Sequence, residues 1–260
     1  MLPQPRSSES DRQRRQVAEY SPGGAHGASC LWGLYIPFQT ECMYQPIKLL
    51  HPPPEPEIIT INREPLAYAT DFTYLGSTVS STARIGKELR NRIGKASTAF
   101  GKLRQRLWNN RHVSIRVKCK VSRAVVLSTL LYGAETWTIF RTQVKKLGAY
   151  MMRQLRDIMS IKWYDKITNE EILRRANLPC MADILIEKNL RWLGHVHRMD
   201  TDRLPRQLLY SQLCEGKRNQ GRPRLRFKDV TKRNMKYRKS DIETWQITAN
   251  DRAAWRSISK

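Results

Sequence analysis

Apolar side chains recur at helical spacing through the middle of this 260-residue chain. The clearest stripe steps by three or four residues, which places its members on one face of a helix with 3.6 residues per turn. Its members are Ile85, Leu89, Ile93, Ala96, Phe100, Leu103 and Leu107. The pattern predicts one long amphipathic helix that ends near Trp108.

The residues before this helix alternate between polar and apolar types, with a period of two. The segment FTYLGSTVS (residues 72–80) is rich in aromatic and β-branched residues and breaks at a Ser/Thr cluster, which is typical of a strand that leads into a helix. Upstream, IITINREPLAYAT (residues 58–70) predicts two short strands around residues 62–65. Residues 58–82 are therefore expected to form a small β-meander.

A second helix is predicted over residues 115–132, with Ser114 as its N-cap. The side chains expected to face inward are Val117, Val121, Ala124, Val125 and Leu131, and those expected to face outward are Arg116, Lys118, Lys120 and Arg123. Gly133 suits the bend that follows this helix.

Further helix starts are predicted from capping residues. The expected caps are Thr142, Thr168 with Glu171 in a capping box, Asp183, and Ser240 with Glu243 in a second box. The helix at Thr142 is expected to bury Val144, Leu147, Met151, Leu155 and Ile158, and the helix at Asp183 to run to His197 and bury Leu185, Trp192 and Val196. Pro179 is expected to end the helix that begins after Thr168. A terminal helix is expected to carry Trp245 and Trp255.

Together these patterns predict a mainly α chain: a small β-meander followed by a bundle of basic amphipathic helices. Residues 1–57 are rich in Pro, Gly and Ser and are expected to be disordered. The predicted order is then a meander over 58–82, helices over 83–160, further helices over 161–200, and a basic tail with a terminal helix over 201–260.

Charge is the exceptional feature of the composition. The chain has 47 Lys and Arg against 23 Asp and Glu, a net charge of +24. Residues 1–70 carry six basic and seven acidic residues, so residues 71–260 hold all of the excess, 41 against 16. A field of one sign this large favours a polyanionic partner, and RNA or DNA is the commonest.

Two basic segments are candidates for contact with phosphates. On the long helix, Arg84, Lys95, Lys102 and Arg106 gather along one flank with Lys87 close by. The segment 216–239 packs 11 Lys and Arg into 24 residues against one acid, Asp229, and includes Lys217, Arg218, Arg222, Arg224, Arg226 and Lys228. Phe227 and Tyr237 lie within it and suit either base stacking or anchoring in a core. The alternative interpretation of both segments is a solvated basic surface or a nuclear-localisation signal.

Membrane and secretory classes are not favoured. The longest apolar stretches are too short to span a bilayer, and neither a lipidation motif nor a signal-peptide pattern is present. Five cysteines at long, irregular spacings favour reduced thiols. A nuclear or cytoplasmic location is expected.

Four sequence blocks carry a resemblance to a known family. FTYLGSTVS with its basic helix is followed by LLYGAETWT (130–138), RWLGHVHRM (191–199) and GRPRLRFKD (221–229). In this order they resemble the carboxy-terminal part of reverse transcriptases from LINE-type (non-LTR, RTE-like) retrotransposons. The resemblance spans about residues 58–257 and implies that the FTYLG strand closes a polymerase palm, that the next helices form the thumb, and that a basic tail follows.

The catalytic chemistry of that family needs magnesium ions held by clustered carboxylates, including a pair of adjacent aspartates upstream of FTYLG. Here the one aspartate before Asp71 is Asp11, and no Asp-Asp pair occurs anywhere. We therefore expect no catalytic residues, no bound metal and no polymerase or nuclease activity. The chain is interpreted as a truncated RNA-directed DNA polymerase fragment that retains nucleic-acid binding.

Other metal and nucleophile sites are not favoured by the spacing. His195 and His197 diverge by roughly 200° on a helix, so they are not expected to share an ion. Cys180 and Cys214 lie 34 residues apart without CxxC spacing, so a zinc knuckle of the kind carried by related elements is not matched. Two alternatives to nucleic-acid binding remain: a helical protein-interaction module with a nuclear-localising tail, and a non-functional transposon remnant.

Overall fold

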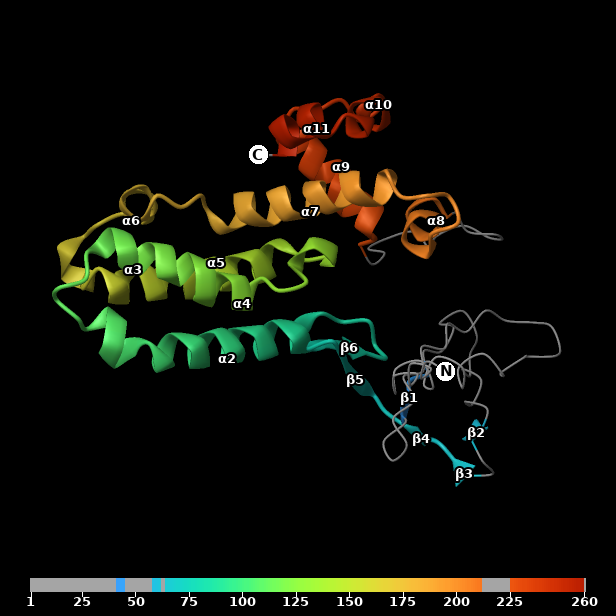
Figure 1. Cartoon of the computed structure of the whole chain (residues 1–260), viewed down its shortest axis with the longest axis horizontal. Coiled ribbons are helices and arrows are strands. Elements are labelled where there is room, and N and C mark those ends of the chain that lie inside the picture. Colours follow the sequence, from blue (N-terminus) through green and yellow to red (C-terminus); the bar gives the residue numbers. More distant parts are fainter. Residues whose placement is uncertain (1–40, 45–57, 62–63, 212–224, 260) are drawn as a thin grey trace, which may run out of the picture. The chain divides into compact units, whose positions relative to one another are not determined.

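The computed structural model describes residues 41–44, 58–61, 64–211 and 225–259, and it divides the chain into two units, Met1–Arg84 and Ile85–Lys260 (Figure 1). Most described residues are helical, which confirms the predicted mainly α class. The expected disorder of residues 1–57 lies outside the described residues, apart from residues 41–44.

The strands of the first unit form three separate pairs. β5 (Asp71–Tyr74) and β6 (Ser77–Ser80) make an antiparallel hairpin, whose turn residues Leu75 and Gly76 have φ values of 47° and 80°. Positive φ at both positions is what a two-residue hairpin turn with the twist of its strands requires. Extended structure is thus confirmed for FTYLGSTVS, but the segment forms two strands joined by a turn instead of the single strand that was predicted.

The single meander predicted for residues 58–82 is wrong. β2 (Thr60–Ile61) pairs antiparallel with β3 (Glu64–Pro65), whereas β4 (Ala67–Tyr68) pairs parallel with β1 (Glu41–Cys42). The Ala69 N–H donates to the Cys42 carbonyl at 2.8 Å. Pairing with a segment 26 residues earlier takes β4 away from its neighbours in sequence, and no local pattern encodes that pairing.

The long basic helix is present as α2 (Gly86–Lys102), followed by one π-helical turn, η2 (Arg104–Trp108). Leu89, Ala96 and Phe100 are buried, and the rest of the predicted stripe packs against them. The Trp108 indole N–H donates to the Phe100 carbonyl at 2.8 Å, and the two rings stack with centroids 4.9 Å apart. The wide turn therefore folds Trp108 back onto α2 and ends the helix.

The next helical run contains α3 (Ile115–Val121), a π-helical segment η3 (Ser122–Leu127) and α4 (Ser128–Leu130). Ser114 caps it as predicted, since its hydroxyl accepts the Val117 N–H at 3.4 Å. The predicted inward face is right only in part. Leu131 is buried and Val121 packs against the hydrophobic core, as predicted, whereas Val117 and Val125 are 46% and 39% exposed. The other buried side chains of this run include Cys119, Ser122, Val126 and Leu130.

The buried face differs from the predicted one from the first turns of this run, before η3 begins. Cys119, Ser122, Val126 and Leu130 step by three, four and four residues, so they form a second stripe at helical spacing. Lys118, predicted to face outward, is buried and donates to the Trp108 carbonyl at 2.7 Å. Its ammonium group satisfies a backbone carbonyl at the end of η2.

α5 (Arg141–Ile158) follows a bend at Gly133 (φ 73°) and the short 3-10 turn η4 (Ala134–Thr136). Its N-cap is Phe140 instead of the predicted Thr142, because the Gln143 side chain accepts the Phe140 N–H at 2.8 Å. The buried stripe of Leu147, Met151, Leu155 and Ile158 is confirmed.

α6 (Asn169–Ala176) is reached through a second 3-10 turn, η5 (Trp163–Asp165). Thr168 caps α6 by accepting the Glu171 N–H at 3.3 Å, as predicted. The Glu171 side chain does not complete a capping box, because Arg174 and Arg175 bind its carboxylate. The helix ends at Asn177, whose φ of 51° breaks it two residues before Pro179.

α7 (Met181–His197) begins two residues before the predicted start, with Cys180 as N-cap; the Cys180 sulfur accepts the Asp183 N–H at 3.4 Å. α8 (Leu204–Tyr210), α9 (Phe227–Tyr237), α10 (Trp245–Asn250) and α11 (Arg252–Ser259) follow. The structure therefore places four helices where a basic tail with one terminal helix was predicted.

The second predicted capping box, Ser240 with Glu243, is also wrong. Asp241 caps this turn, since its carboxylate accepts the Glu243 N–H at 2.9 Å and the Thr244 hydroxyl at 2.7 Å. Trp245 and Trp255 lie on two helices, α10 and α11, instead of one.

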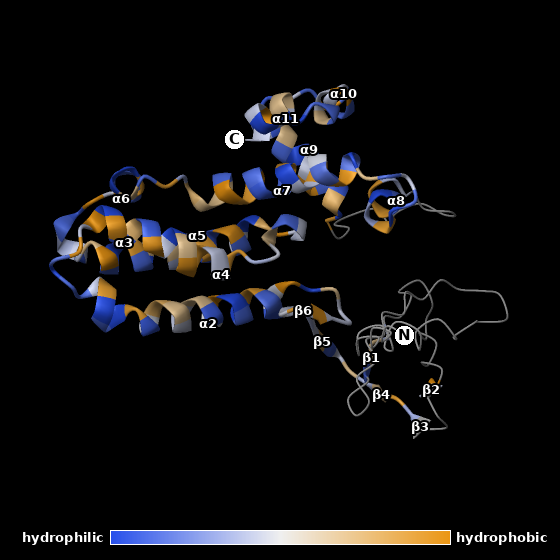
Figure 2. Ribbon diagram, in the orientation of Figure 1, coloured by the Kyte–Doolittle hydropathy of each residue, from blue (hydrophilic) through white to orange (hydrophobic). Residues whose placement is uncertain are grey.

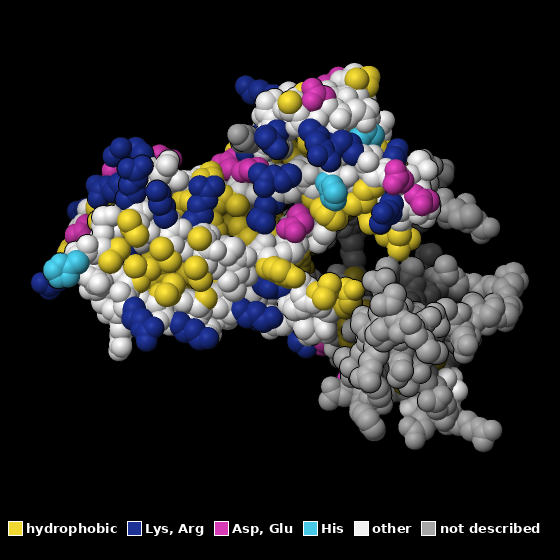
Figure 3. All heavy atoms as spheres, in the orientation of Figure 1, with side chains coloured by type: hydrophobic (Ala, Val, Ile, Leu, Met, Phe, Trp, Pro, Cys, Tyr) yellow, Lys and Arg dark blue, Asp and Glu magenta, His cyan; other side chains and the backbone are white. Residues whose placement is uncertain are grey.

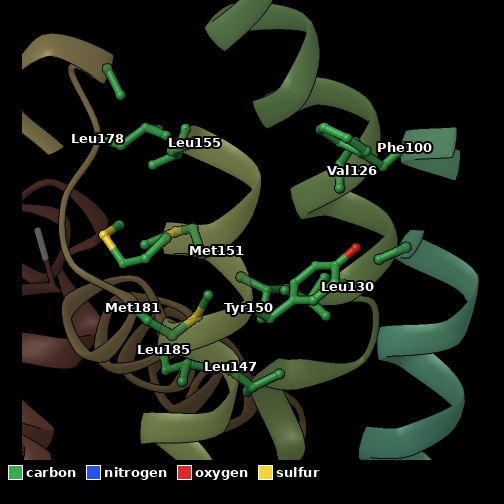
Figure 4. Packing of buried hydrophobic residues seen from close by; sticks show 14 of the residues in the cluster. Phe100, Val126, Leu130, Leu147, Tyr150, Met151, Leu155, Leu178, Met181 and Leu185 are labelled. Atoms are coloured by element: carbon green, nitrogen blue, oxygen red, sulfur yellow. The ribbon is translucent and has the colours of Figure 1, made fainter. Parts of the chain in front are cut away.

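The second unit contains two hydrophobic cores that share α7, and apolar residues line the inner sides of its helices (Figure 2). The first core packs side chains of α2, η3, α4, α5 and α6 against the first half of α7, and Figure 4 shows its centre around Leu130, Leu147 and Leu185. The second core packs α8 to α11 against the second half of α7.

Candidate nucleic-acid interface

Basic residues of α2 line one side of an open groove. Lys95 and Lys102 lie two helical turns apart and are both exposed. They share the groove with Thr98, Ala99, Leu103 and, from the neighbouring helix, Val125. We call this the α2–η3 groove. Lys87 and Arg106 are exposed on the same helical run, toward its two ends, whereas Arg84 belongs to the other unit.

The acidic residues near this groove are engaged in other contacts. Glu88 is the one carboxylate of α2; it is buried, and the Arg92 guanidinium contacts it at 2.6 Å. Arg92 in turn stacks over the Tyr132 ring at 4.5 Å. Asp157 is exposed and pairs with Arg104 at 2.6 Å. Within the part of the chain that the structure describes, Lys102 and Arg106 have no ion-pair partner, so their charges are available to a ligand.

Exposed basic residues also follow the neighbouring helical run. Arg116, Lys120 and Arg123 are spaced by four and three residues along α3 and η3, and all three are exposed. Val117 and Val125 of the same helical run are also exposed, and Val125 lines the groove. Figure 3 shows apolar side chains gathered over this part of the helices, with Lys and Arg side chains on both sides. The 3.6-residue period of the three cations was visible in the sequence, although the valine face was expected to be buried.

The carboxy-terminal basic segment is only partly described. Lys217, Arg218, Arg222 and Arg224 lie outside the described residues. The Arg226 guanidinium lies 3.4 Å from Asp229, whose carboxylate also accepts the Arg226 N–H at 3.0 Å and so caps α9. Lys228 is half-buried, donates to the Ser211 carbonyl at 3.4 Å and lies 6.0 Å from the Tyr210 ring. These two cations thus support the start of α9.

The aromatic residues of this segment differ from each other. Phe227 is half-buried and packs against the second core, which favours its anchoring role over base stacking. Tyr237 is 61% exposed at the end of α9.

The two histidines of α7 face different surroundings. His195 is exposed beside Trp192, with ring centroids 5.3 Å apart. His197 is buried; its Nδ1 lies 2.6 Å from the Tyr210 hydroxyl and its Nε2 lies 3.1 Å from the Asn250 side-chain oxygen. Because an amide oxygen only accepts, Nε2 carries the proton and Nδ1 accepts from Tyr210. Burial lowers the pKa of His197, which keeps the ring neutral.

Other chemistry is sparse among the described residues. Cys42, Cys119 and Cys180 are free thiols, as expected, and burial raises the pKa of each. Across residues 41–44, 58–61, 64–211 and 225–259, no three His, Cys, Asp or Glu side chains gather closely enough to hold a metal ion. In the same ranges, no helix combines the length and apolar character needed to cross a bilayer.

Comparison with known proteins gives one significant similarity. The chain is 24% identical over 195 residues to an uncharacterized transposon-derived protein of Caenorhabditis elegans, and the match covers 72% of this chain and 69% of that protein. This similarity supports a transposon origin. No protein-family model and no solved structure matches the chain.

Proposed function

We propose that the chain is a fragment of an RTE-like LINE reverse transcriptase that binds RNA or DNA without sequence preference. The four sequence blocks and the transposon-derived relative support this origin. The observation that carries the binding function is the α2–η3 groove, where Lys95 and Lys102 lie beside Arg106 on a helical run whose one carboxylate is buried and neutralised.

The binding would depend on phosphate contacts. Each Lys or Arg that neutralises a phosphate releases a condensed counterion, so affinity falls steeply with salt. If six to ten phosphates are engaged, affinity should fall by about 10³ to 10⁵ between 50 and 200 mM salt. A flat salt response would contradict the proposal.

A charge-matched pair of variants tests the site. Replacing Lys95, Lys102 and Arg106 by alanine should lower the affinity for a duplex by about tenfold or more and reduce the salt slope by roughly 3. The control replaces Arg174, Arg175 and Arg191, three exposed cations already paired with Glu171 or Glu187. It removes the same charge and should cost much less affinity. Equal losses would show that only net charge matters.

A second candidate function is protein docking, favoured by the exposed apolar residues Ile115 and Val117, which are 49% and 46% exposed. Replacing both by serine should leave nucleic-acid affinity within twofold under the first proposal. Loss of a protein partner in pull-downs, with nucleic-acid affinity unchanged, would support docking instead.

Catalysis by the chain is not part of the proposal. The paired aspartates that hold magnesium in the family precede FTYLG, and the one aspartate before Asp71 here is Asp11. Primer extension by the purified chain, with magnesium or manganese present, would contradict this interpretation.

A further inference from the structure

Two aromatic side chains in the connection between α5 and α6 are exposed to solvent. Trp163 is 89% exposed and Tyr164 is 63% exposed, and Trp163 is the most exposed large hydrophobic side chain that the structure describes. Their ring centroids lie 5.9 Å apart with an interplanar angle of 73°. The indole of Trp163 is therefore almost fully accessible to solvent.

Hydrogen bonds and core contacts on both sides of Trp163 and Tyr164 fix the turn that carries them. The Asp165 carboxylate accepts the Lys162 N–H at 2.7 Å, and the Asp165 N–H donates to the Lys162 carbonyl at 3.2 Å, which closes the turn η5. After the turn, the Arg156 guanidinium donates to the Ile167 carbonyl at 3.3 Å. Ile161 and Ile167, on either side, pack against the first core. The aromatic pair is therefore presented by an anchored turn.

The surroundings of the pair are basic and polar. Lys162 and Lys166 are exposed on either side of it, while Asp165 is used within the turn. The nearby contact between Arg104 of η2 and Asp157 of α5, at 2.6 Å, joins the start of this connection to the helical run that carries Arg106.

We propose that Trp163 and Tyr164 form a stacking site for unpaired bases of single-stranded nucleic acid, with Lys162 and Lys166 on its phosphates. Aromatic faces stack on any base, and a cationic border follows the backbone without reading sequence. A protein-docking anchor would be expected within a larger apolar patch, whereas the residues on both sides of this pair are charged. The inference rests on the proposed nucleic-acid binding and adds a preference for single strands.

The test measures binding of labelled oligonucleotides to the full chain by fluorescence anisotropy. The probes are a single strand of about 16 nucleotides and a duplex of equal length. Trp163→Ala should weaken single-strand binding by about 5- to 150-fold, the range of alanine substitutions at stacked aromatics, and duplex binding by less than twofold. The salt slope should not change, since no charge is removed. Trp163→Phe should retain most of the affinity.

Matched controls separate the possible outcomes. Phe140→Ala removes a half-exposed aromatic from another connection and should leave both affinities unchanged. The urea midpoint of Trp163→Ala should equal that of the wild type, because the side chain is almost fully exposed. Unchanged single-strand affinity in Trp163→Ala, with weakened binding in the Lys95, Lys102 and Arg106 variant, overturns the stacking site but not the proposed function. Equal loss of affinity for the single strand and the duplex also overturns it.

Discussion

The two hydrophobic cores that share α7 are held together in different ways. Among the residues that the structure describes, the first contains 22 buried hydrophobic residues, supplied by long apolar stripes on α2 and α5 and by the helices around them. The second contains seven in the same ranges, and specific polar contacts cross it. The Trp255 indole N–H donates to the Leu190 carbonyl at 2.8 Å, and Asn234 donates to the Asn189 side-chain oxygen at 2.9 Å.

The difference follows from the lengths of the elements. α8, α10 and α11 have seven, six and eight residues, and helices this short are not stable alone in water. Their apolar faces are also too small to fix their positions by burial. The contacts of His197 with α8 and α10 and of Trp255 on α11 therefore help to position these short helices. We therefore expect the first core to tolerate loss of one contact better than the second.

The largest expected effect is the removal of Trp255, which is 2% exposed. Trp255→Ala should lower the free energy of unfolding by about 3–5 kcal/mol, because a large ring and its hydrogen bond are both lost. Urea denaturation followed by circular dichroism measures this. Leu147→Ala, at a fully buried position of the first core, is the counterpart, with about 2–5 kcal/mol expected. A cost below 1 kcal/mol for Trp255→Ala would remove the contrast between the cores.

A smaller effect is expected from a single added methyl group. A Cβ at Gly194 would overlap the Trp255 indole, so Gly194→Ala should destabilise by about 1–3 kcal/mol. The control is Gly94→Ala on α2, where a Cβ meets nothing within 4 Å. Gly94→Ala should raise the free energy of unfolding by about 0.5–1 kcal/mol, since alanine has a higher helix propensity than glycine. Thermal or urea unfolding of both variants decides whether the close approach of α11 to α7 is needed.

The pH dependence of stability should also distinguish the cores. Burial lowers the pKa of His197, so the folded state binds fewer protons than the unfolded state, and stability is lost as pH falls below about 6.5. One group contributes at most about 1.4 kcal/mol per pH unit. His197→Gln should make the free energy of unfolding less dependent on pH between about pH 7.5 and 5.5. Equal slopes for wild type and His197→Gln would contradict this role.

The smallest effect is expected at the surface of the first core. Arg104 and Asp157 are 53% and 44% exposed, so their ion pair should contribute only about 0.2–1 kcal/mol. In urea denaturation, Arg104→Ala should lower the free energy of unfolding by this small amount at low salt and by almost nothing at 1 M NaCl. If Arg104→Ala lowered the free energy of unfolding by several kcal/mol, the position of η2 would depend on this ion pair. The first core would then rely on a specific polar contact as the second core does.

Much of the first core could be predicted from the sequence. The stripes of α2 and α5 follow the helical period closely, and Ser114 and Thr168 cap helices where their side chains can reach the third N–H. The face of the 115–130 run could not be predicted, because Lys118 is buried only through its contact with the Trp108 carbonyl, which the local pattern does not reveal.

The candidate site was predictable in part. The exposed cations of α2 follow from the same stripe that buries Leu89 and Phe100, since they occupy the opposite flank of the helix. The groove itself could not be predicted, because Val125 was expected to be buried. It is instead exposed on η3 and lines the groove. The roles of Arg226 and Lys228 depend on Asp229 and on the Ser211 carbonyl, and the latter lies 17 residues away.

The sequence by itself determined the helical class, the positive charge and the first and last turns of several helices, because these depend on residue type and on neighbours within a turn or two. Only the tertiary structure decided the parallel pairing of β1 with β4, which face of the 115–130 helical run is buried, and the contacts that hold α8 to α11 on α7. Each of these depends on a partner group supplied by a distant part of the chain, and periodicity carries no information about such partners.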